Sequence, residues 1–189
     1  MKKVGKYIAA AAISVMTAGA AMAGDYYGGY GDYGSASALS GLYVRGDIGA
    51  AMLEWDGGKD DTGFLFGAGL GWSFNQYLRA DVRYSHAGKF KVGGGTDLTA
   101  SSVMGNIYFD LPLQDWPLRP YLGTGLGYGW TDVSPGSDDS GLAAAFMAGV
   151  SYNMTPNLVL DAGYRFHDIM VSGPDVTDHQ VMIGMRYHF

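Results

Sequence analysis

Hydrophobic residues alternate with small or polar residues from Leu39 to the end of the chain, a two-residue period that is typical of β-strands. In the segment 41–54, Leu42, Val44 and Ile48 share one face, while charged and small residues occupy the other. We predict eight strands of this kind, at about residues 41–54, 62–74, 77–90, 97–110, 118–131, 142–153, 157–169 and 178–189.

The connections between these strands alternate in length. Short connections lie near residues 75–76, 112–116 and 155–156, and the others are longer and rich in Gly, Asp, Ser and Pro. Short turns on one rim and longer loops on the other are typical of a transmembrane β-barrel, with its short turns in the periplasm. A closed barrel also satisfies every backbone amide and carbonyl inside a bilayer. We therefore predict an all-β fold, an eight-stranded antiparallel up-and-down transmembrane β-barrel over residues 41–189.

Charged residues of both signs occupy the face opposite the apolar one. A water-exposed face would favour Lys and Glu, but this face contains mainly Arg and short Asp, which pair in a fixed fork geometry. With Glu54 included, five arginines face five acids, and this balance suits a buried interior, where unpaired charges are costly. An eight-stranded barrel is just wide enough inside to hold side chains. We predict a lumen plugged by an ion-pair network of Arg45, Asp47, Arg79, Asp81, Arg83, Asp110, Asp161, Arg165 and Arg186.

Glycines recur at inward positions of two predicted strands. Gly67, Gly69 and Gly71 alternate in one strand, and four more alternate over residues 123–129 of another. We expect them to make room for Tyr43 and the arginines across the lumen. A phosphate-binding loop is disfavoured, because no helix follows these glycines to supply the N-terminal dipole.

The N-terminus has the three-part layout of a secretory signal peptide. Three lysines precede an apolar run over residues 7–18, and Ala21 and Ala23 supply the small residues that a signal peptidase reads. We predict cleavage after Ala23, with residues 1–23 as the signal peptide. Residues 24–40 are rich in Gly and Tyr without periodicity, and we predict a flexible periplasmic leader.

Composition narrows the function further. Removal of the signal peptide leaves 189 − 23 = 166 residues with 12 − 3 = 9 basic and 18 acidic side chains, a net charge of −9. An acidic chain without basic clusters argues against nucleic acid as a partner. Because the chain has no cysteine, disulfides and cysteine-based metal sites are excluded. We expect no metal and no cofactor.

Three motifs resemble the outer-membrane β-barrel superfamily, and most of all small alphaproteobacterial surface proteins related to the transmembrane domain of outer membrane protein A. They are the strand opening over residues 43–49, the Gly-x-Gly-x-Gly strands, and the closing Arg-Tyr-His-Phe of residues 186–189. The resemblance implies a bacterial outer-membrane location, with outer-membrane lipid and lipopolysaccharide as surroundings. It also implies that Tyr187 and Phe189 form the signal that the outer-membrane assembly machinery recognises.

We therefore interpret the chain as a structural protein that presents four surface loops to an unknown ligand for interaction or adhesion, because a rigid scaffold allows loops to carry recognition. The loops are acidic, with Asp56, Asp60, Asp132 and Asp138 among their residues. Divalent cations bridging these acids to lipopolysaccharide are one hypothesis, and simple solvation of the acids is favoured over it.

Three competing functions depend on a few polar residues. A lipid A-modifying enzyme would need a nucleophilic Ser with a His, and Ser85 with His86, or Ser172 with His167 and Asp168, are the candidates. The first pair consists of strand neighbours, which point to opposite faces. We therefore expect no enzymatic activity.

A haem or small-ligand receptor would use histidines near the outer rim, namely His86, His167 and His179. Histidines at loop edges are more often simply solvated, so this reading ranks below the structural one. A diffusion pore, the remaining alternative, is disfavoured by the arginines expected in the lumen.

Overall fold

The structure is a computed structural model that describes residues 41–54, 61–91, 97–114, 116–134, 139–170 and 176–189. The signal peptide, Ala21, Ala23 and the leader lie outside these residues. The strands are β1 (Gly41–Glu54), β2 (Asp61–Ser73), β3 (Leu78–Lys91), β4 (Asp97–Asp110), β5 (Leu118–Ser134), β6 (Asp139–Asn153), β7 (Leu158–Met170) and β8 (Val176–His188).

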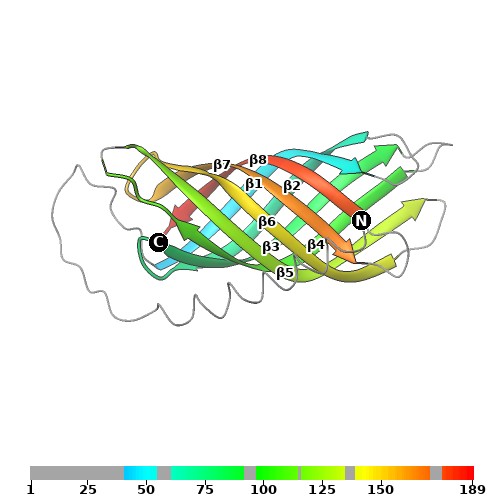
Figure 1. The fold of residues 1–189 in the computed structure, drawn as a ribbon, viewed down its shortest axis with the longest axis horizontal. Coiled ribbons are helices and arrows are strands. Elements are labelled where there is room, and N and C mark those ends of the chain that lie inside the picture. Colours follow the sequence, from blue (N-terminus) through cyan, green and yellow to red (C-terminus); the bar gives the residue numbers. More distant parts are fainter. Residues whose placement is uncertain (1–40, 55–60, 92–96, 115, 135–138, 171–175) are drawn as a thin grey trace.

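The eight strands form one closed barrel in sequence order (Figure 1). Each strand pairs antiparallel with its neighbours in the chain, and β8 pairs with β1 to close the sheet. The predicted fold class is therefore confirmed. Within the part of the chain that the structure describes, no helix has the length and hydrophobicity required to cross a bilayer.

Strand boundaries differ most from the prediction at one end of the β5–β6 hairpin. Both strands extend into the predicted loop over residues 132–140, with Trp130 opposite Ser140 and Thr131 opposite Asp139. Thr131, Asp139 and Ser140 are polar and interrupt the apolar alternation. Backbone hydrogen bonding between strands does not require alternating polarity, so the two strands stay paired beyond the end of the hydrophobic pattern.

One end of the barrel, here called the short-turn rim, holds the connections 74–77, 111–117 and 154–157. Asn75 Oδ1 accepts hydrogen bonds from the backbone N–H groups of Tyr77 and Leu78 at 2.8 and 2.9 Å, which closes the β2–β3 turn. Thr155 Oγ1 closes the β6–β7 turn in a similar way. The C-terminus lies at the same rim, where the Phe189 N–H donates to the Leu42 carbonyl at 3.1 Å (Figure 1).

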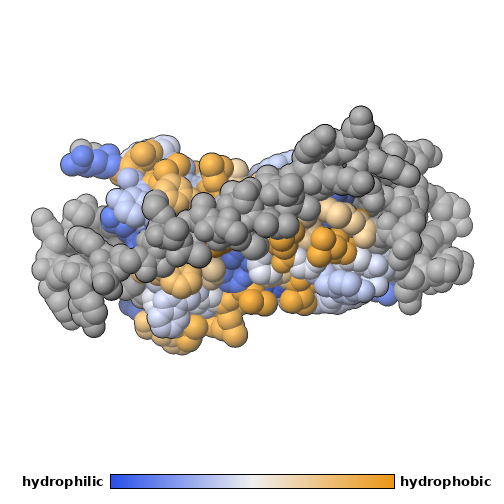
Figure 2. Space-filling view, turned by 60° about the horizontal axis from the view of Figure 1, so that its bottom comes forward, coloured by the Kyte–Doolittle hydropathy of each residue, from blue (hydrophilic) through white to orange (hydrophobic). Residues whose placement is uncertain are grey.

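The apolar face of the strands points outward, as predicted. Ile48 of β1, Leu122 of β5 and Ile183 of β8 are 59%, 59% and 57% exposed, and hydrophobic residues gather over the visible wall in Figure 2. The interior is polar instead, because Arg79 and Arg83 are among the largest fully buried side chains. This arrangement is the reverse of a water-soluble protein and suits a barrel with a lipid-covered wall.

Inward glycines accommodate bulky neighbours, as the sequence predicts. A Cβ on Gly71 would overlap the ring of Tyr43, and a Cβ on Gly123 would lie 2.6 Å from the ring of Tyr108. On β2, a Cβ on Gly69 would lie 3.3 Å from Arg45 Cγ. Over residues 67–71, β2 therefore has no inward side chain and leaves space that residues of β1 and β3 fill.

Candidate functional site: the polar interior of the barrel

A cluster of opposite charges lies between the inner faces of β1 and β3. Arg45 Nη2 donates to Asp47 Oδ1 at 2.7 Å, and Arg45 Nη1 donates to Asp81 Oδ2 at 3.0 Å. Arg83 Nη2 lies 3.0 Å from the second oxygen of Asp47. All four side chains are at most 4% exposed, so these pairs are removed from solvent.

Two features of the sequence bring these charges together, namely the alternation of side chains along β1 and β3 and the glycines of the intervening β2. Arg45 and Asp47 are two residues apart on β1, so they share one face. The β2 strand between β1 and β3 offers only Gly67, Gly69 and Gly71 over this stretch, and the register places Arg45 opposite Gly69, Asp47 opposite Gly67, and Gly69 opposite Arg83. The β1 and β3 side chains can therefore meet across β2.

Asp81 of β3 accepts hydrogen bonds from residues of two other strands. Asn106 Nδ2 donates to it at 2.7 Å, and the Tyr43 hydroxyl donates at 3.2 Å. Tyr108 accepts from Arg45 Nη1 at 3.2 Å. These partners come from β1 and β4, so the carboxylate of Asp81 joins three strands in one network.

Two further pairs lie nearer the short-turn rim. Arg79 Nε donates to both oxygens of Asp110 at 2.9 and 3.2 Å, and its guanidinium carbon lies 3.9 Å from the centre of the Tyr108 ring. Arg186 holds Asp161 through two hydrogen bonds of 2.6 and 3.0 Å. The Arg186–Asp161 pair is bidentate, with two donor nitrogens on two oxygens, and so restricts both partners in orientation as well as distance.

Arg165 differs from the other predicted members of the network. Among the described residues it has no carboxylate within ion-pair distance; its Nε donates to Gln180 Oε1 at 2.7 Å and its Nη1 to Ser85 Oγ at 3.1 Å. Gln180 in turn donates to Asp178 at 2.5 Å, and Asp178 pairs with His167 Nδ1 at 3.0 Å. A polar chain rather than a direct ion pair therefore surrounds this buried arginine.

Two charged residues of this interior escaped the sequence analysis. Asp178 continues the inward alternation of β8, which could have identified it, and Arg119 faces inward at the start of β5. Glu54, counted among the lumen acids, has a side chain outside the described part of the structure.

An apolar cluster fills part of the interior on the side away from the short-turn rim. Its members come from β4, β6 and β7 and are Ala100, Met104, Ala143, Ala145 and Ile169. These residues point inward from strands whose outward-pointing residues are also apolar. Side-chain direction therefore still alternates along these strands, but polarity does not.

The histidines and the serine considered for other functions lie on opposite sides of the barrel wall. His167 faces inward and is 2% exposed, whereas His86 of β3 and His179 of β8 occupy outward positions. A haem ligand set of these three histidines is therefore not assembled. Ser85 faces inward, away from His86, as predicted.

His86 has a different hydroxyl partner on the outer wall. Its Nδ1 lies 2.8 Å from the Oγ of Ser101 on β4, and Ser101 is 5% exposed. Ser172 lies outside the described residues. The described residues contain no group of three or more His, Cys, Asp or Glu that could hold a metal.

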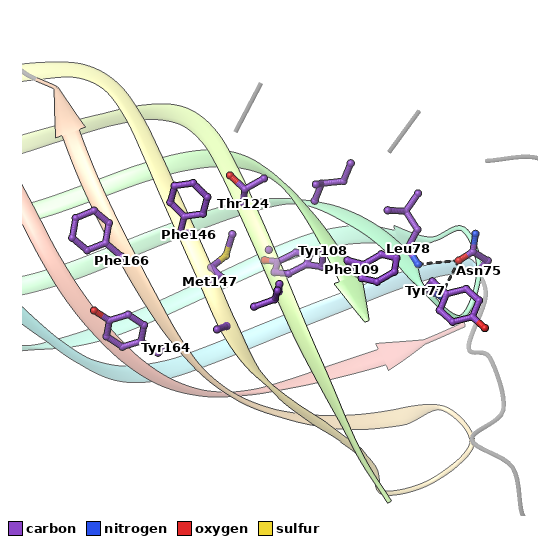
Figure 3. Close-up of a pocket in the computed structure, with 14 residues that line it drawn as sticks. Asn75, Tyr77, Leu78, Tyr108, Phe109, Thr124, Phe146, Met147, Tyr164 and Phe166 are labelled. Carbon is purple, nitrogen blue, oxygen red and sulfur yellow. Dashed lines mark hydrogen bonds between the residues drawn. The ribbon is translucent and has the colours of Figure 1, made fainter. Parts of the chain in front are cut away.

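A largely apolar groove of about 980 Å³ runs along β4 to β7 (Figure 3). Most of its lining residues occupy outward positions, and Thr124 lies between the bulkier Ile107 and Phe146 in the register. Ala148 lies between Leu122 and Tyr164 in the adjacent row. The groove therefore forms where small side chains interrupt an aromatic and aliphatic wall.

The two residues of the expected assembly signal lie at the short-turn rim. Tyr187 and Phe189 are 47% and 71% exposed, and their rings contact edge to face at 5.3 Å. Tyr43, for which the inward glycines were expected to make room, is fully buried in the interior.

Comparison with known proteins places this geometry among membrane barrels. The family model described as outer membrane protein beta-barrel domain matches residues 8–189. An uncharacterized protein of Brucella abortus is 31% identical over 214 residues, covering 77% of this chain and 75% of the relative. An outer membrane protein of Gluconacetobacter diazotrophicus is 26% identical, covering 69% of this chain and 48% of the relative.

Solved structures give the same result. Neisserial surface protein A is similar at 30% identity with a TM-score of 0.70, covering 79% of this chain and 98% of that protein. The attachment invasion locus protein of Yersinia pestis is similar at 22% identity with a TM-score of 0.51, covering 80% and 100%, and supports the fold alone.

Proposed function

The chain belongs to the family of outer membrane protein β-barrel domains, and we propose that it is a structural barrel without enzymatic activity that presents four surface loops for interaction or adhesion while its own side chains close the lumen. It is a protein of the bacterial outer membrane. Its exposed outer wall contacts outer-membrane lipid and lipopolysaccharide, and the groove between β4 and β7 accepts acyl chains.

The orientation follows from the two rims. In outer-membrane barrels the short turns face the periplasm and the longer loops face the medium. The short-turn rim is therefore the periplasmic rim, and Tyr187 and Phe189 act there as the assembly signal. The four connections at the opposite rim face the medium. The similarity to Neisserial surface protein A, named for its place at the cell surface, supports this assignment.

Surface labelling tests the loop assignment. We expect an epitope tag inserted between residues 135 and 138 to bind antibody on intact cells, because this connection lies on the medium side. The same tag inserted between Thr155 and Pro156, at the other end of β6, should be labelled only after permeabilisation. Labelling of the second tag on intact cells, in a protein that keeps its heat-modifiable gel shift, would reverse the orientation.

The proposed closure of the lumen rests on the buried side chains. Arg79, Arg83 and Arg165 are at most 1% exposed, and charge pairs or polar chains hold them across the barrel. A lumen filled by paired side chains leaves no continuous water path of ion size. Ion pairs fixed between several strands also stiffen the wall that supports the loops.

Planar-bilayer recording tests the closure. The purified protein should give no conductance steps above those of detergent added alone, because the charged side chains occupy the lumen. Long-lived, uniform steps that appear only with the protein would contradict the sealed lumen and favour a diffusion pore.

A further inference from the structure

Charges in the interior do not balance at the periplasmic end. The described strands place six arginines inside, Arg45, Arg79, Arg83, Arg119, Arg165 and Arg186. They place five aspartates inside, Asp47, Asp81, Asp110, Asp161 and Asp178. Among the residues that the structure describes at the periplasmic end, Arg79, Arg119 and Arg186 face only Asp110 and Asp161, and each of these acids already pairs with an arginine other than Arg119.

Arg119 is the cation left over by this pairing. It lies at the start of β5, is 8% exposed, and has no carboxylate within ion-pair distance among the described residues. Its Nη2 donates to the backbone carbonyl of Gln76 at 2.7 Å, while its buried Nε has no hydrogen-bond partner. A buried guanidinium without a counter-charge is costly, so this position favours an anion.

Two neighbours present further unused polar atoms at this end. Arg79 Nε donates to Asp110, whereas its buried Nη1 and Nη2 have no hydrogen-bond acceptor. His188, the last residue of β8, is 2% exposed with neither ring nitrogen bonded, and its ring lies 5.2 Å from that of Tyr43. Arg119 and Arg79 lie close together, because Arg119 bonds to the β2–β3 turn just before Arg79, and the Arg79 guanidinium carbon lies 4.9 Å from the ring of Tyr121 on the same strand as Arg119. His188 lies two residues after Arg186 on the same inward face of β8, at this rim.

We propose that the periplasmic mouth of the barrel binds a compact oxyanion, a carboxylate or a phosphate, through Arg119 with Arg79 and His188. The planar fork of arginine matches both groups, and an anion would supply the missing charge and acceptors for these donors. Above this mouth the interior charges are held by ion pairs or, at Arg165, by a polar chain of hydrogen bonds, so the ligand enters from the periplasm and stops at the Arg79 and Arg186 pairs. A peptide C-terminus and a phosphate group share this chemistry.

Side-chain NMR of the refolded protein tests the proposal directly. Maltoside micelles are suitable because they contain neither phosphate nor carboxylate. Sodium acetate and sodium phosphate are titrated separately, with sodium chloride holding ionic strength constant, while the Arg119 Nε–H and His188 ring signals are followed. We expect saturable shifts with at least one probe. The tighter-binding probe identifies the source, acetate for a peptide carboxylate and phosphate for a phosphate group.

Variants separate this site from general charge effects. Arg119→Gln should weaken binding roughly tenfold or more, because it removes a charge-assisted hydrogen bond. Lys91→Gln, which removes one positive charge at the opposite end of the barrel, should bind as wild type. Arg119→Lys, which keeps the charge but loses the fork, should bind with intermediate affinity.

A fold check keeps the test decisive. Each variant is first examined for the heat-modifiable gel shift of a folded barrel. If Arg119→Gln does not fold, His188→Phe replaces it, since phenylalanine retains the ring beside Tyr43 but donates no hydrogen bond. Weaker binding by His188→Phe supports the site. No saturable shift with either probe, or unchanged affinity in the folded variants, overturns it.

Discussion

Replacing Asp47 with alanine is expected to destabilise the barrel by about 3–5 kcal/mol, the range typical of breaking a buried ion pair by removing one partner. Asp47 neutralises two guanidinium groups, those of Arg45 and Arg83, at 2.7 and 3.0 Å. Its loss leaves Arg45 with Asp81 and the Tyr108 hydroxyl, whereas Arg83 keeps no carboxylate partner among the described residues and donates only to the Met182 sulfur. The free energy of unfolding, measured by urea titration in lipid vesicles, gives the magnitude.

Asp132→Ala is the matched control for this change. Asp132 is exposed near the end of β5 that lies away from the short-turn rim, and it accepts a long hydrogen bond, 3.5 Å, from Thr99. Its replacement should change stability by no more than about 0.5 kcal/mol, as surface substitutions generally do. If Asp47→Ala were as mild as Asp132→Ala, the interior would be well hydrated and the charge pairs would not hold the barrel together.

Arginine in place of Ile183 is expected to destabilise the barrel by about 2–4 kcal/mol, the effect of a cation on the lipid face near the bilayer midplane. Ile183 lies near the middle of β8, between Ile48 of β1 and Ala162 of β7 in the register. Its side chain is 57% exposed on the outer wall. In a water-soluble barrel, a charged residue at so exposed a position would have little effect.

Leu113→Arg separates lipid contact from simple exposure. Leu113 is 48% exposed, similar to Ile183, but it lies in the connection between β4 and β5 at the short-turn rim. Arginine there should cost about 0–1 kcal/mol, the range near the membrane interface. Equal effects at the two positions would show that the wall around Ile183 does not lie in hydrocarbon. Both values come from the same vesicle-based unfolding titration.

Strand number, order and facing could be predicted because each depends on local alternation. The β1 and β4 ranges agree with the predicted ones, and the inward set includes all nine residues chosen for the lumen. Successive side chains of a strand point to opposite faces even where inward and outward residues have the same polarity. For this reason Met104 and Ile169 were missed as interior residues although their strands were placed correctly.

Pairing across the lumen could not be predicted from the sequence alone. Which inward residues meet depends on strand tilt and on empty space left by glycines several strands away, and neither is a local property. Arg165 therefore pairs with Gln180 and Ser85 rather than with an acid. Arg119 was overlooked because it precedes Pro120 at a strand start, where alternation has barely begun.

Cysteine scanning along β8 tests the inside-out arrangement most directly, since the natural chain has no cysteine. Spin labels at Gln180, Val181, Met182, Ile183 and Met185 report contact with oxygen dissolved in lipid and with a water-soluble nickel chelate. We predict strong oxygen contact at Val181, Ile183 and Met185, and low contact with either reagent at Gln180 and Met182. Oxygen contact in the opposite phase, or without alternation, would contradict the barrel described above.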